Sequence, residues 1–520
     1  MNGSKVSKYP WKVLGIVMLG TLMAALDSSI VNVSLPAMMA DFGASLDDIE
    51  WVITGYMLGF AAFMPLTTWF RDVIGHKFLY IFSLVVFTAG SVLCGLAWNL
   101  SALIVARLLQ ALGGAALTPT GMAMISEEFA PAERAKALAY WGLGVIVGPA
   151  FGPTLGGWLT HVFGWRSIFL INLPIGVIGT IWALGTLRRD QPHASRRKPF
   201  DLWGFLFLAV ALVGFLLGIS KGEHEGWTSP YIIACLAVSA VAAIGFLLVE
   251  SIVENTIIDL ELFRFPVFSA CMAVTVVRSI ALFGGVFLLP LFLQQVRGLD
   301  EIDSGLIMLP GSLVVGFMMP LTPRLMSRFG TRLLAVSGLL IVACFMFMYR
   351  HIDINTSTWD LIFPTLIRGV GLGMLFTPVM VTALNHVPVE KTAMASSMLN
   401  LIQQIGGSIG IAMLATVFSH RMTFHVAMLG GSIDSRSPAF RHAFHALSAH
   451  AHTIGYSHAQ SAQIAGMGVG KMVARKAMVA AFGDSFLFGT GLVLLGVIAA
   501  LLLPGQRTKA EADAGLAAME

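Results

Sequence analysis

The sequence predicts an all-α integral membrane protein with fourteen transmembrane helices, built as two six-helix bundles with two further helices inserted between them. Three observations predict this class. The 520-residue chain is 57% hydrophobic and 12% charged, whereas soluble domains average about 25% charged residues. Its apolar residues fall in runs long enough to cross a bilayer as helices, since ~20 residues suffice. Motifs of the first half of the chain recur in the second half.

Fourteen apolar runs follow one another along the chain. The first is too long for the core of a secretory signal, so we interpret it as a retained span. Because fourteen is an even number, both termini are predicted on the same side of the membrane. The runs are approximately 12–35, 50–70, 78–98, 101–125, 136–160, 165–187, 201–220, 230–250, 267–295, 304–326, 332–350, 359–384, 393–420 and 479–503.

The distribution of Lys and Arg predicts a cytoplasmic N-terminus. With that orientation the cytoplasmic segments carry nineteen Lys and Arg residues, and the short outer loops carry four. Positive charge is retained inside during insertion, although long loops such as 421–478 escape the rule. We therefore expect a multi-pass protein of the inner, cytoplasmic membrane with both termini cytoplasmic.

An internal repeat relates runs 2–5 to runs 10–13. "PLTTWFRDVIGHK" (65–77) aligns without a gap to "PLTPRLMSRFGTR" (320–332), which pairs Gly75 with Gly330. Parallel six-helix repeats are typical of one class of secondary transporter, with the site at the midplane between the halves. The predicted divisions are 1–187, an N-terminal six-helix bundle; 188–265, a linker with two helices; 266–503, a C-terminal six-helix bundle with the long outer loop 421–478; and 504–520, a tail.

Asp27 is a carboxylate inside the first apolar run. A charge at the centre of a membrane costs ~2.5 kcal/mol or more on insertion scales, and such residues are functional candidates. One interpretation is a structural carboxylate hydrogen-bonded to Ser28, Asn32 or a neighbouring helix. The other is a group that alternates between protonated and ionised forms as the cavity changes sides, since burial raises a carboxyl pKa and a nearby cation lowers it.

Arg107 and Gln110 lie on roughly one face of the fourth run. Arg107 either extends to the outer membrane surface or points inward beside a titrating carboxylate. Further intramembrane charges are Arg278 and Asp484. Arg278 is a candidate for the cavity or for a salt bridge, and Asp484 is the second candidate for proton coupling. Predicted cavity residues are Asp27, Asn32, Gln110, Arg278 and Gln403.

Glycines recur every fourth residue in the fifth run, beside two prolines. Small residues allow two helices to approach closely, and each proline removes an internal hydrogen bond and permits a kink. The pattern predicts a bending or sliding helix, with ordinary close packing as the alternative. The residues are Gly144, Gly148, Pro149, Gly152, Pro153 and Gly156.

Asp72 and Arg134 lie in two predicted cytoplasmic connections. An ion pair between these connections, next to Gly75, would latch one conformation. The alternative is a solvated Asp72, because exposed ion pairs contribute only ~0–1 kcal/mol.

The outer loop 421–478 and its edge hold seven of the thirteen histidines. Their irregular spacing predicts no metal site, and the four cysteines are expected to be buried and unpaired. Part of the loop is a candidate helix. No basic run is interleaved with aromatic residues as a nucleic-acid surface requires, and no nucleophile–base pair indicates an enzyme.

Five segments in order resemble the signatures of the major facilitator superfamily, specifically its fourteen-helix drug:proton antiporters (EmrB/QacA type). They are "LDSSIVNVSLP", "WFRDVIGHK", "ARLLQALGGAALTP", "GLGVIVGPAFGPTLGG" and "GWRSIFLINLPIG". The resemblance implies the major facilitator fold and export of hydrophobic or amphipathic drugs driven by the proton motive force, with no cofactor. It also implies a periplasmic adaptor and an outer-membrane channel as partners at the outer loop.

The same resemblance implies roles for individual residues. Asp27 and Arg107 match the family's first-span acid and fourth-span arginine, and Asp72 matches its loop aspartate. The element at 148–153 matches its antiporter segment. Thr68 and Val73 depart from the family's usual Gly and basic residue, which implies a weaker or differently partnered latch. An exporter of one endogenous metabolite or fatty acid is the alternative function with the same fold.

Overall fold

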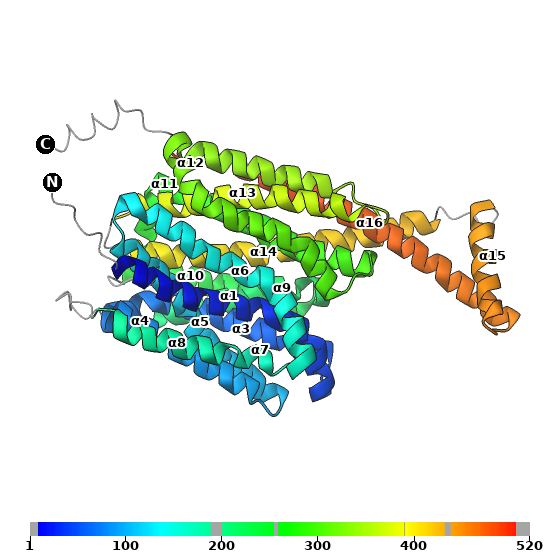
Figure 1. Ribbon diagram of the computed structural model, residues 1–520, viewed down its shortest axis with the longest axis horizontal. Coiled ribbons are helices and arrows are strands. Elements are labelled where there is room, and N and C mark those ends of the chain that lie inside the picture. Colours follow the sequence, from blue (N-terminus) through cyan, green and yellow to red (C-terminus); the bar gives the residue numbers. More distant parts are fainter. Residues whose placement is uncertain (1–8, 189–199, 254–257, 389–390, 432–437, 506–520) are drawn as a thin grey trace.

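The computed structural model describes residues 9–188, 200–253, 258–388, 391–431 and 438–505. Within these ranges the regular secondary structure is helical, with no β-strand. The helices form one elongated bundle, and α1 (Tyr9–Phe42) begins at the same end at which α16 (His458–Leu501) finishes (Figure 1). We call this the termini end. The opposite end, beyond which α15 lies, is the extension end.

The helices follow the predicted order of two halves and an insert. The N-terminal half contains α1 (Tyr9–Phe42), α2 (Leu46–Ile49), α3 (Trp51–Phe63), α4 (Leu66–Gly95), α5 (Leu100–Glu128), α6 (Pro131–Phe163), α7 (Ser167–Leu170) and α8 (Asn172–Thr186). The insert contains α9 (Leu202–Glu225), α10 (Pro230–Ile252) and the short η1 (Leu260–Arg264). The C-terminal half contains α11 (Pro266–Leu291), the π-helical turn η2 (Phe292–Val296), α12 (Glu301–Tyr349), α13 (Thr358–Asn385), α14 (Thr392–Gly431), α15 (Pro438–Thr453) and α16 (His458–Leu501).

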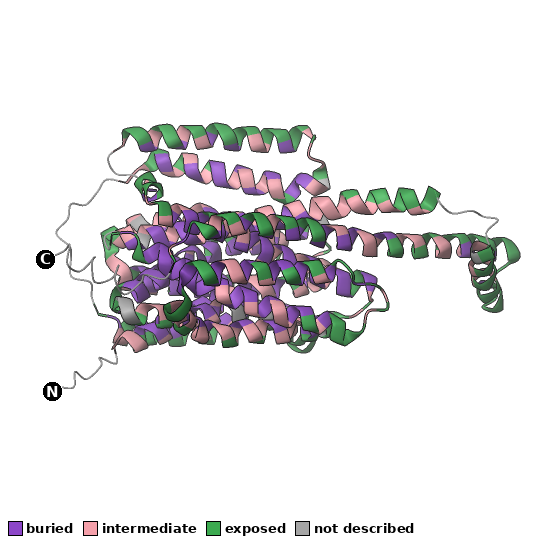
Figure 2. Cartoon of the chain, turned by 90° about the horizontal axis from the view of Figure 1, so that it is seen from above, coloured by how far each residue is buried: buried purple, intermediate pink, exposed green. Residues whose placement is uncertain are grey.

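Eleven helices of the described chain are long and apolar enough to cross a membrane. The predicted total of fourteen is consistent with them. The long helix α12 contains two predicted spans, α3 with the first turns of α4 contains another, and α6 coincides with the fifth. Buried residues fill the middle of the bundle and exposed ones its surface (Figure 2). Many of the exposed side chains are large and apolar, such as Val241, Ile244 and Leu248 of α10, as expected for a surface in contact with lipid.

The internal repeat is visible in the backbone. Gly75 interrupts α4 with φ 79° and ψ 165°, and Gly330 interrupts α12 with φ 76° and ψ 166°. Such positive φ values strongly favour glycine because it lacks a Cβ. The sequence alignment that paired these two glycines is therefore confirmed by matching local geometry at the termini end.

Glycines also pack equivalent helix pairs in the two halves. In the N-terminal half α6 lies against α1, and a Cβ added at Gly148 would be 2.5 Å from the carbonyl carbon of Ala25. In the C-terminal half α14 lies against α11, and a Cβ added at Gly410 would be 2.6 Å from Cα of Ile280. Any larger residue would push these helices apart.

The inserted helices contact both halves near the extension end. Lys221 of α9 is buried and donates a 2.6 Å hydrogen bond to Glu50, which precedes α3. Trp227, in the turn after α9, donates a 3.1 Å hydrogen bond to Thr416 of α14. The insert thus links the two bundles.

The linker after α10 is attached to the C-terminal half at the termini end. Lys391, just before α14, forms ion pairs with Asp259 and with Glu261, the latter at 2.8 Å. The hydrogen bonds to these two carboxylates raise the pKa of Lys391 above its ordinary value. The ammonium group therefore stays charged at neutral pH and holds the linker in place.

The segment predicted as a long outer loop, 421–478, is mostly helical. α14 continues to Gly431 and α16 already begins at His458, so both run past the bundle (Figure 1). α15 packs against α16 at the tip. A capping box between Ser457 and Gln460 fixes the start of α16.

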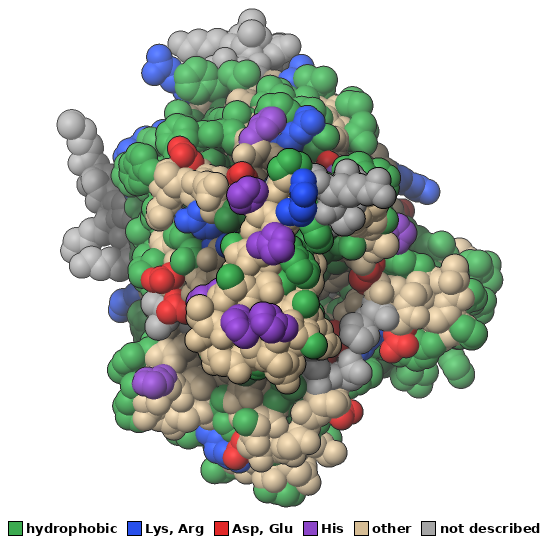
Figure 3. All heavy atoms as spheres, turned by 90° about the vertical axis from the view of Figure 1, so that its right-hand side faces the viewer, with side chains coloured by type: hydrophobic (Ala, Val, Ile, Leu, Met, Phe, Trp, Pro, Cys, Tyr) green, Lys and Arg blue, Asp and Glu red, His purple; other side chains and the backbone are tan. Residues whose placement is uncertain are grey.

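Histidines gather at this end of the molecule (Figure 3). Those of α15 are exposed: His442, His445, His450 and His452. In the described part of the chain, no three His, Cys, Asp or Glu side chains are grouped so as to hold a metal ion.

Candidate functional site

A cavity of about 560 Å³ lies between the two halves of the bundle. Helices α1, α3, α5 and α6 line it from one half, and α11 to α14 line it from the other. Most of the lining is apolar, with aromatic side chains that include Tyr56, Trp141, Phe287 and Phe376. The volume lies within the range of about 300–1,000 Å³ that is typical of small-molecule sites.

Asp27 is fully buried on α1 and accepts three hydrogen bonds. Arg107 Nη1 donates to its Oδ2 at 2.6 Å, and Gln110 and Asn172 donate to its Oδ1 at 2.9 and 3.0 Å. The contact with Arg107 is an ion pair in which neither side chain is more than 1% exposed. A buried charge requires a partner and hydrogen bonds, so this network explains how α1 accommodates a carboxylate in an apolar run.

Ser91 of α4 completes the network. Asn172 and Gln110 also donate to its Oγ at 2.9 and 3.1 Å, and the hydroxyl donates to the carbonyl of Phe169 at 2.9 Å. The carboxylate is therefore held by side chains from α5 and α8, which are themselves oriented by α4. The three hydrogen bonds to Asp27 thus depend on the position of α1 relative to α5 and α8.

Arg107 lies between Asp27 and the cavity. Its guanidinium stands 4.0 Å from the ring centroid of Tyr56, and its Nε donates to the carbonyl of Val52 at 3.2 Å. Both Arg107 and Tyr56 line the cavity. The arginine therefore points into the bundle and does not extend to the membrane surface. Arg107 thus forms part of the cavity wall, and its ion-pair partner Asp27 lies behind it.

The C-terminal half has a buried arginine of its own. Arg278 of α11 is 4% exposed, and its Nη2 donates to Gln403 Oε1 at 2.8 Å. The guanidinium lies 4.5 Å from the ring centroid of Phe376. Gln403 and Phe376 both line the cavity, so Arg278 is immediately behind them.

The structure places the predicted cavity residues in two layers. Asn32 and Gln403 are on the lining, whereas Asp27, Gln110 and Arg278 are buried behind it. The buried charges contact partners inside each half, because an apolar lining does not stabilise a bare charge. These three residues therefore act on the cavity contents only through neighbours such as Arg107 and Gln403.

The glycine stripe of α6 lies along α1, next to Asp27. Gly148 and Gly152 contact the turn that contains Ala25 and Ser29, and Ser29 donates a 3.0 Å hydrogen bond to the carbonyl of Gly148. Gly144 faces the preceding turn more loosely. The side chains of Pro149 and Pro153 lie outside the described part of the structure, so the bending role of this motif stays a prediction.

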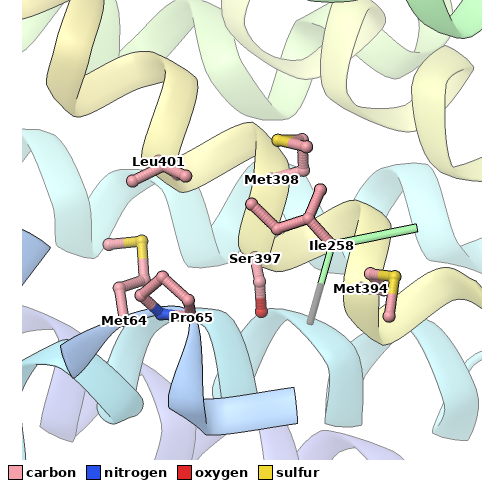
Figure 4. A pocket seen from close by; sticks show the side chains of 7 residues that line it. All are labelled: Met64, Pro65, Ile258, Met394, Ser397, Met398 and Leu401. Carbon is pink, nitrogen blue, oxygen red and sulfur yellow. The ribbon is translucent and has the colours of Figure 1, made fainter. Parts of the chain in front are cut away.

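The two halves touch at the termini end. Thr67 and Ser397 place their hydroxyl oxygens 3.2 Å apart, which joins α4 to α14. Figure 4 shows the small pocket beside this contact, which is lined by Met64 and Pro65 and by Met394, Ser397 and Met398 of α14. The two halves are therefore in contact at this end in the present conformation.

The predicted latch has different partners. Asp72 forms an ion pair with its neighbour Arg71, and Arg134 donates a 3.0 Å hydrogen bond to Asn385 of the opposite half. The expected ion pair between Asp72 and Arg134 is not formed. The adjacent guanidinium of Arg71 already satisfies the carboxylate, and Arg134 joins the halves without it. Gly75 lies at the kink of α4.

Asp484 lies away from the cavity, where α14 and α16 begin to extend beyond the bundle. It pairs with Arg421, and His425 Nε2 lies 2.8 Å from its Oδ2. It does not belong to the described cavity lining. Asp484 thus joins the two helices of the extension.

Sequence reasoning missed Ser91, Asn172 and Tyr56. A single Ser or Asn in an apolar run adds little to the free energy of membrane insertion and is common, so the sequence did not single out Ser91 or Asn172. Their importance depends on the packing of α4, α5 and α8 around Asp27. The segment "INLPIG", already noted as part of a motif, offered the one signal for Asn172.

Residues 17–411 match the family model described as the Major Facilitator Superfamily. The chain belongs to this superfamily. Relatives include the multidrug export protein EmrB of Escherichia coli, 32% identical over 81% of this chain and 82% of that protein. The multidrug resistance protein Stp of Mycobacterium tuberculosis is 35% identical over 77% of this chain and 74% of its own length. The uncharacterized MFS-type transporter YhcA of Bacillus subtilis is 32% identical over 85% of this chain and 82% of its own length.

The structure of the human organic anion transporter MFSD10 (TETRAN) superposes with a TM-score of 0.61 at 13% identity, over 94% of this chain and 99% of that one. This likeness concerns the fold alone. The predicted family and the all-α membrane fold are confirmed, and the major facilitator chain is a multi-pass membrane transporter and not an enzyme.

Proposed function

We propose that this transporter is a proton-driven multidrug efflux antiporter that exports hydrophobic and amphipathic compounds from the cytoplasm or the inner leaflet by alternating access. Two relatives are named as multidrug proteins, and the cavity is drug-sized and mostly apolar. The energy source is the proton motive force, and no cofactor takes part.

The observation that carries this proposal is the buried ion pair between Asp27 and Arg107, of which Arg107 lines the cavity. A proton that binds Asp27 removes the negative charge and releases the guanidinium from its ion pair. Proton binding and the state of the cavity wall are therefore linked. Each proton that enters contributes ~2.3 kcal/mol per 100 mV of membrane potential.

Helix packing supplies the route from this pair to the rest of the bundle. The close contact of Gly148 with the turn containing Ala25 lies half a turn from Asp27 on α1. When α6 moves along α1, it carries that turn with it. Protonation of Asp27 and rearrangement of the two halves are thereby coupled.

We assign the termini end to the cytoplasm of the inner membrane, in agreement with the excess of Lys and Arg there. The helical extension then lies in the periplasm. Its exposed apolar side chains, among them Phe424, Met428, Met467 and Met472, suit contact with a periplasmic adaptor that continues to an outer-membrane channel.

Proteoliposomes with an imposed pH gradient test this function, with a panel of lipophilic cations, neutral drugs and fatty acids as substrates. Wild type should move several of them against their gradient, and an uncoupler should stop it. Asp27→Asn should abolish gradient-driven transport, whereas Asp41→Asn, the same change at an exposed position of α1, should retain it. Full transport by Asp27→Asn, or wild-type transport that ignores the uncoupler, would overturn the proposal. Transport of one fatty acid or metabolite alone would favour the specific exporter.

A further inference from the structure

Arg278 is a buried cation that the proton-coupling mechanism does not use. Its guanidinium contacts Gln403 and Phe376. Its Nε is buried without a hydrogen-bond partner. Among the described residues, no carboxylate forms an ion pair with it. Burying a charge in this way is costly, so the arrangement is poised for an anion that the protein itself does not supply.

Gln403 transmits this charge to the cavity. A guanidinium group can only donate hydrogen bonds, so the amide oxygen of Gln403 must face Arg278. The amide NH₂ is then on the other branch of the side chain, and Gln403 lines the cavity. The cavity wall therefore presents a hydrogen-bond donor that is polarised by a cation behind it.

The balance of charge around the cavity is positive. Arg107 is the charged residue on the described lining, and Asp27 neutralises it. Adding Arg278 leaves one uncompensated positive charge. The rest of the nearby lining is apolar, with Phe283 and Phe287 on the same helix as Arg278, and so matches the apolar part of an amphiphile.

We propose that Gln403 and Arg278 form a subsite for the anionic group of an amphipathic organic anion, such as a carboxylate or sulfonate attached to an aromatic or alkyl body. The anion accepts a hydrogen bond from Gln403 and neutralises Arg278. A cation of the same size is disfavoured at this position. The inference names a substrate class for the proposed exporter and, as far as transport is concerned, rests on that function.

Binding is measured on the purified full chain in a neutral maltoside detergent without anionic lipid. The probes are 2-naphthalenesulfonate and the (2-naphthylmethyl)trimethylammonium cation, which share a ring system and keep their charges at every pH used. Isothermal titration calorimetry of wild type should show tighter binding of the sulfonate. Equal or tighter binding of the ammonium probe overturns the proposal without any variant.

The variants locate the subsite. Arg278→Gln removes the charge behind Gln403 but leaves the Gln403 side chain in place, and it should weaken sulfonate binding by roughly tenfold. Arg278→Lys keeps the charge and should retain most of the affinity. Arg324→Gln makes the same change at an exposed position of α12 outside the described cavity lining and should leave the affinity nearly unchanged. Unchanged sulfonate binding in Arg278→Gln would refute the assignment.

Two further readouts separate this inference from others. Competition by phosphatidylglycerol that displaces the sulfonate would assign the subsite to a lipid headgroup and overturn the substrate proposal. A wild-type protein that binds sulfonate selectively but shows no pH-driven transport would refute the antiporter while leaving the subsite intact. Export of cationic drugs by a protein that does not prefer the sulfonate probe would refute the subsite and leave the antiporter intact.

Discussion

Removing the charge of Asp27 alone should destabilise the fold more than removing the charges of Asp27 and Arg107 together. In Asp27→Asn, Arg107 remains at about 1% exposure without its counter-ion, and an unpaired buried charge costs about 3–5 kcal/mol. Arg107 keeps its bonds to Gln110 and Val52 and its stacking on Tyr56. We therefore expect the lower end, about 3 kcal/mol.

In the double variant Asp27→Asn/Arg107→Gln, neutral amides replace both charges. Replacing a whole buried ion pair is often close to neutral, so the double variant should recover about 2 kcal/mol relative to Asp27→Asn. The assay is thermal unfolding in detergent, followed by the monomer peak in size-exclusion chromatography. Arg107→Gln alone completes the double-mutant cycle.

The expected order of stability is wild type, double variant, then the two single variants. If the double variant loses the sum of the two single losses, the charges are not coupled and the reasoning from burial fails. A folded double variant also gives the transport assay a protein without the titratable group. If this folded double variant does not couple transport to the pH gradient, misfolding is not the cause.

Three other changes test the helix contacts in the same vesicle assay. Gly148→Ala should abolish transport, because the added Cβ would lie 2.5 Å from the backbone of α1. Gly157→Ala on the same helix, with its nearest neighbour 3.7 Å away, should be tolerated, and equal effects would contradict a sliding contact. Thr67→Cys/Ser397→Cys should form a disulfide that stops transport until it is reduced, since the native hydroxyls are 3.2 Å apart. Unimpaired transport by the oxidised form would mean that the termini end need not open there. Asp484→Asn should leave pH-driven transport nearly intact but make the extension more sensitive to protease. Loss of coupling would instead restore Asp484 to the proton pathway.

The sequence predicts the bundle well because bilayer-spanning helices have few alternatives. Every backbone group in lipid must be hydrogen-bonded within the helix, so the length and hydrophobicity of an apolar run largely suffice to predict a spanning helix. The repeat paired Gly75 with Gly330, and the structure shows that each of them interrupts its helix in the same way. The extension was harder to predict, since α15 and the outer parts of α14 and α16 lack the continuous apolar run on which the prediction of spans depends.

Charged members of the site were predictable for a related reason. Asp27, Arg107 and Arg278 are conspicuous in apolar runs because burying a charge is expensive. The neutral residues Asn172 and Ser91 were not predictable. Asn172 reaches Asp27, and Ser91 reaches Asn172 and Gln110, only because the helices pack together. The expected ion pair of Asp72 with Arg134 is not formed in this structure, because position in a loop does not identify the partner of a carboxylate, and the adjacent Arg71 forms the pair.

The two halves share a scaffold but not a charge distribution. Equivalent glycines kink α4 and α12 and join α6 to α1 and α14 to α11. The N-terminal half contains an acid and a base in contact, whereas the C-terminal half buries Arg278 and Arg368, neither of which forms an ion pair with a carboxylate among the described residues. This division has an energetic consequence for the proposed exchange. An anion leaving the cell and a proton entering it each move one charge in the favourable direction, so one exchange gains ~4.6 kcal/mol per 100 mV, twice the value for one charge. A neutral substrate gains half as much from the potential, and a cation gains nothing from it at one proton per cycle. The unpaired Arg278 beside the cavity thus favours anionic substrates in binding, and the membrane potential favours the same substrates in driving force.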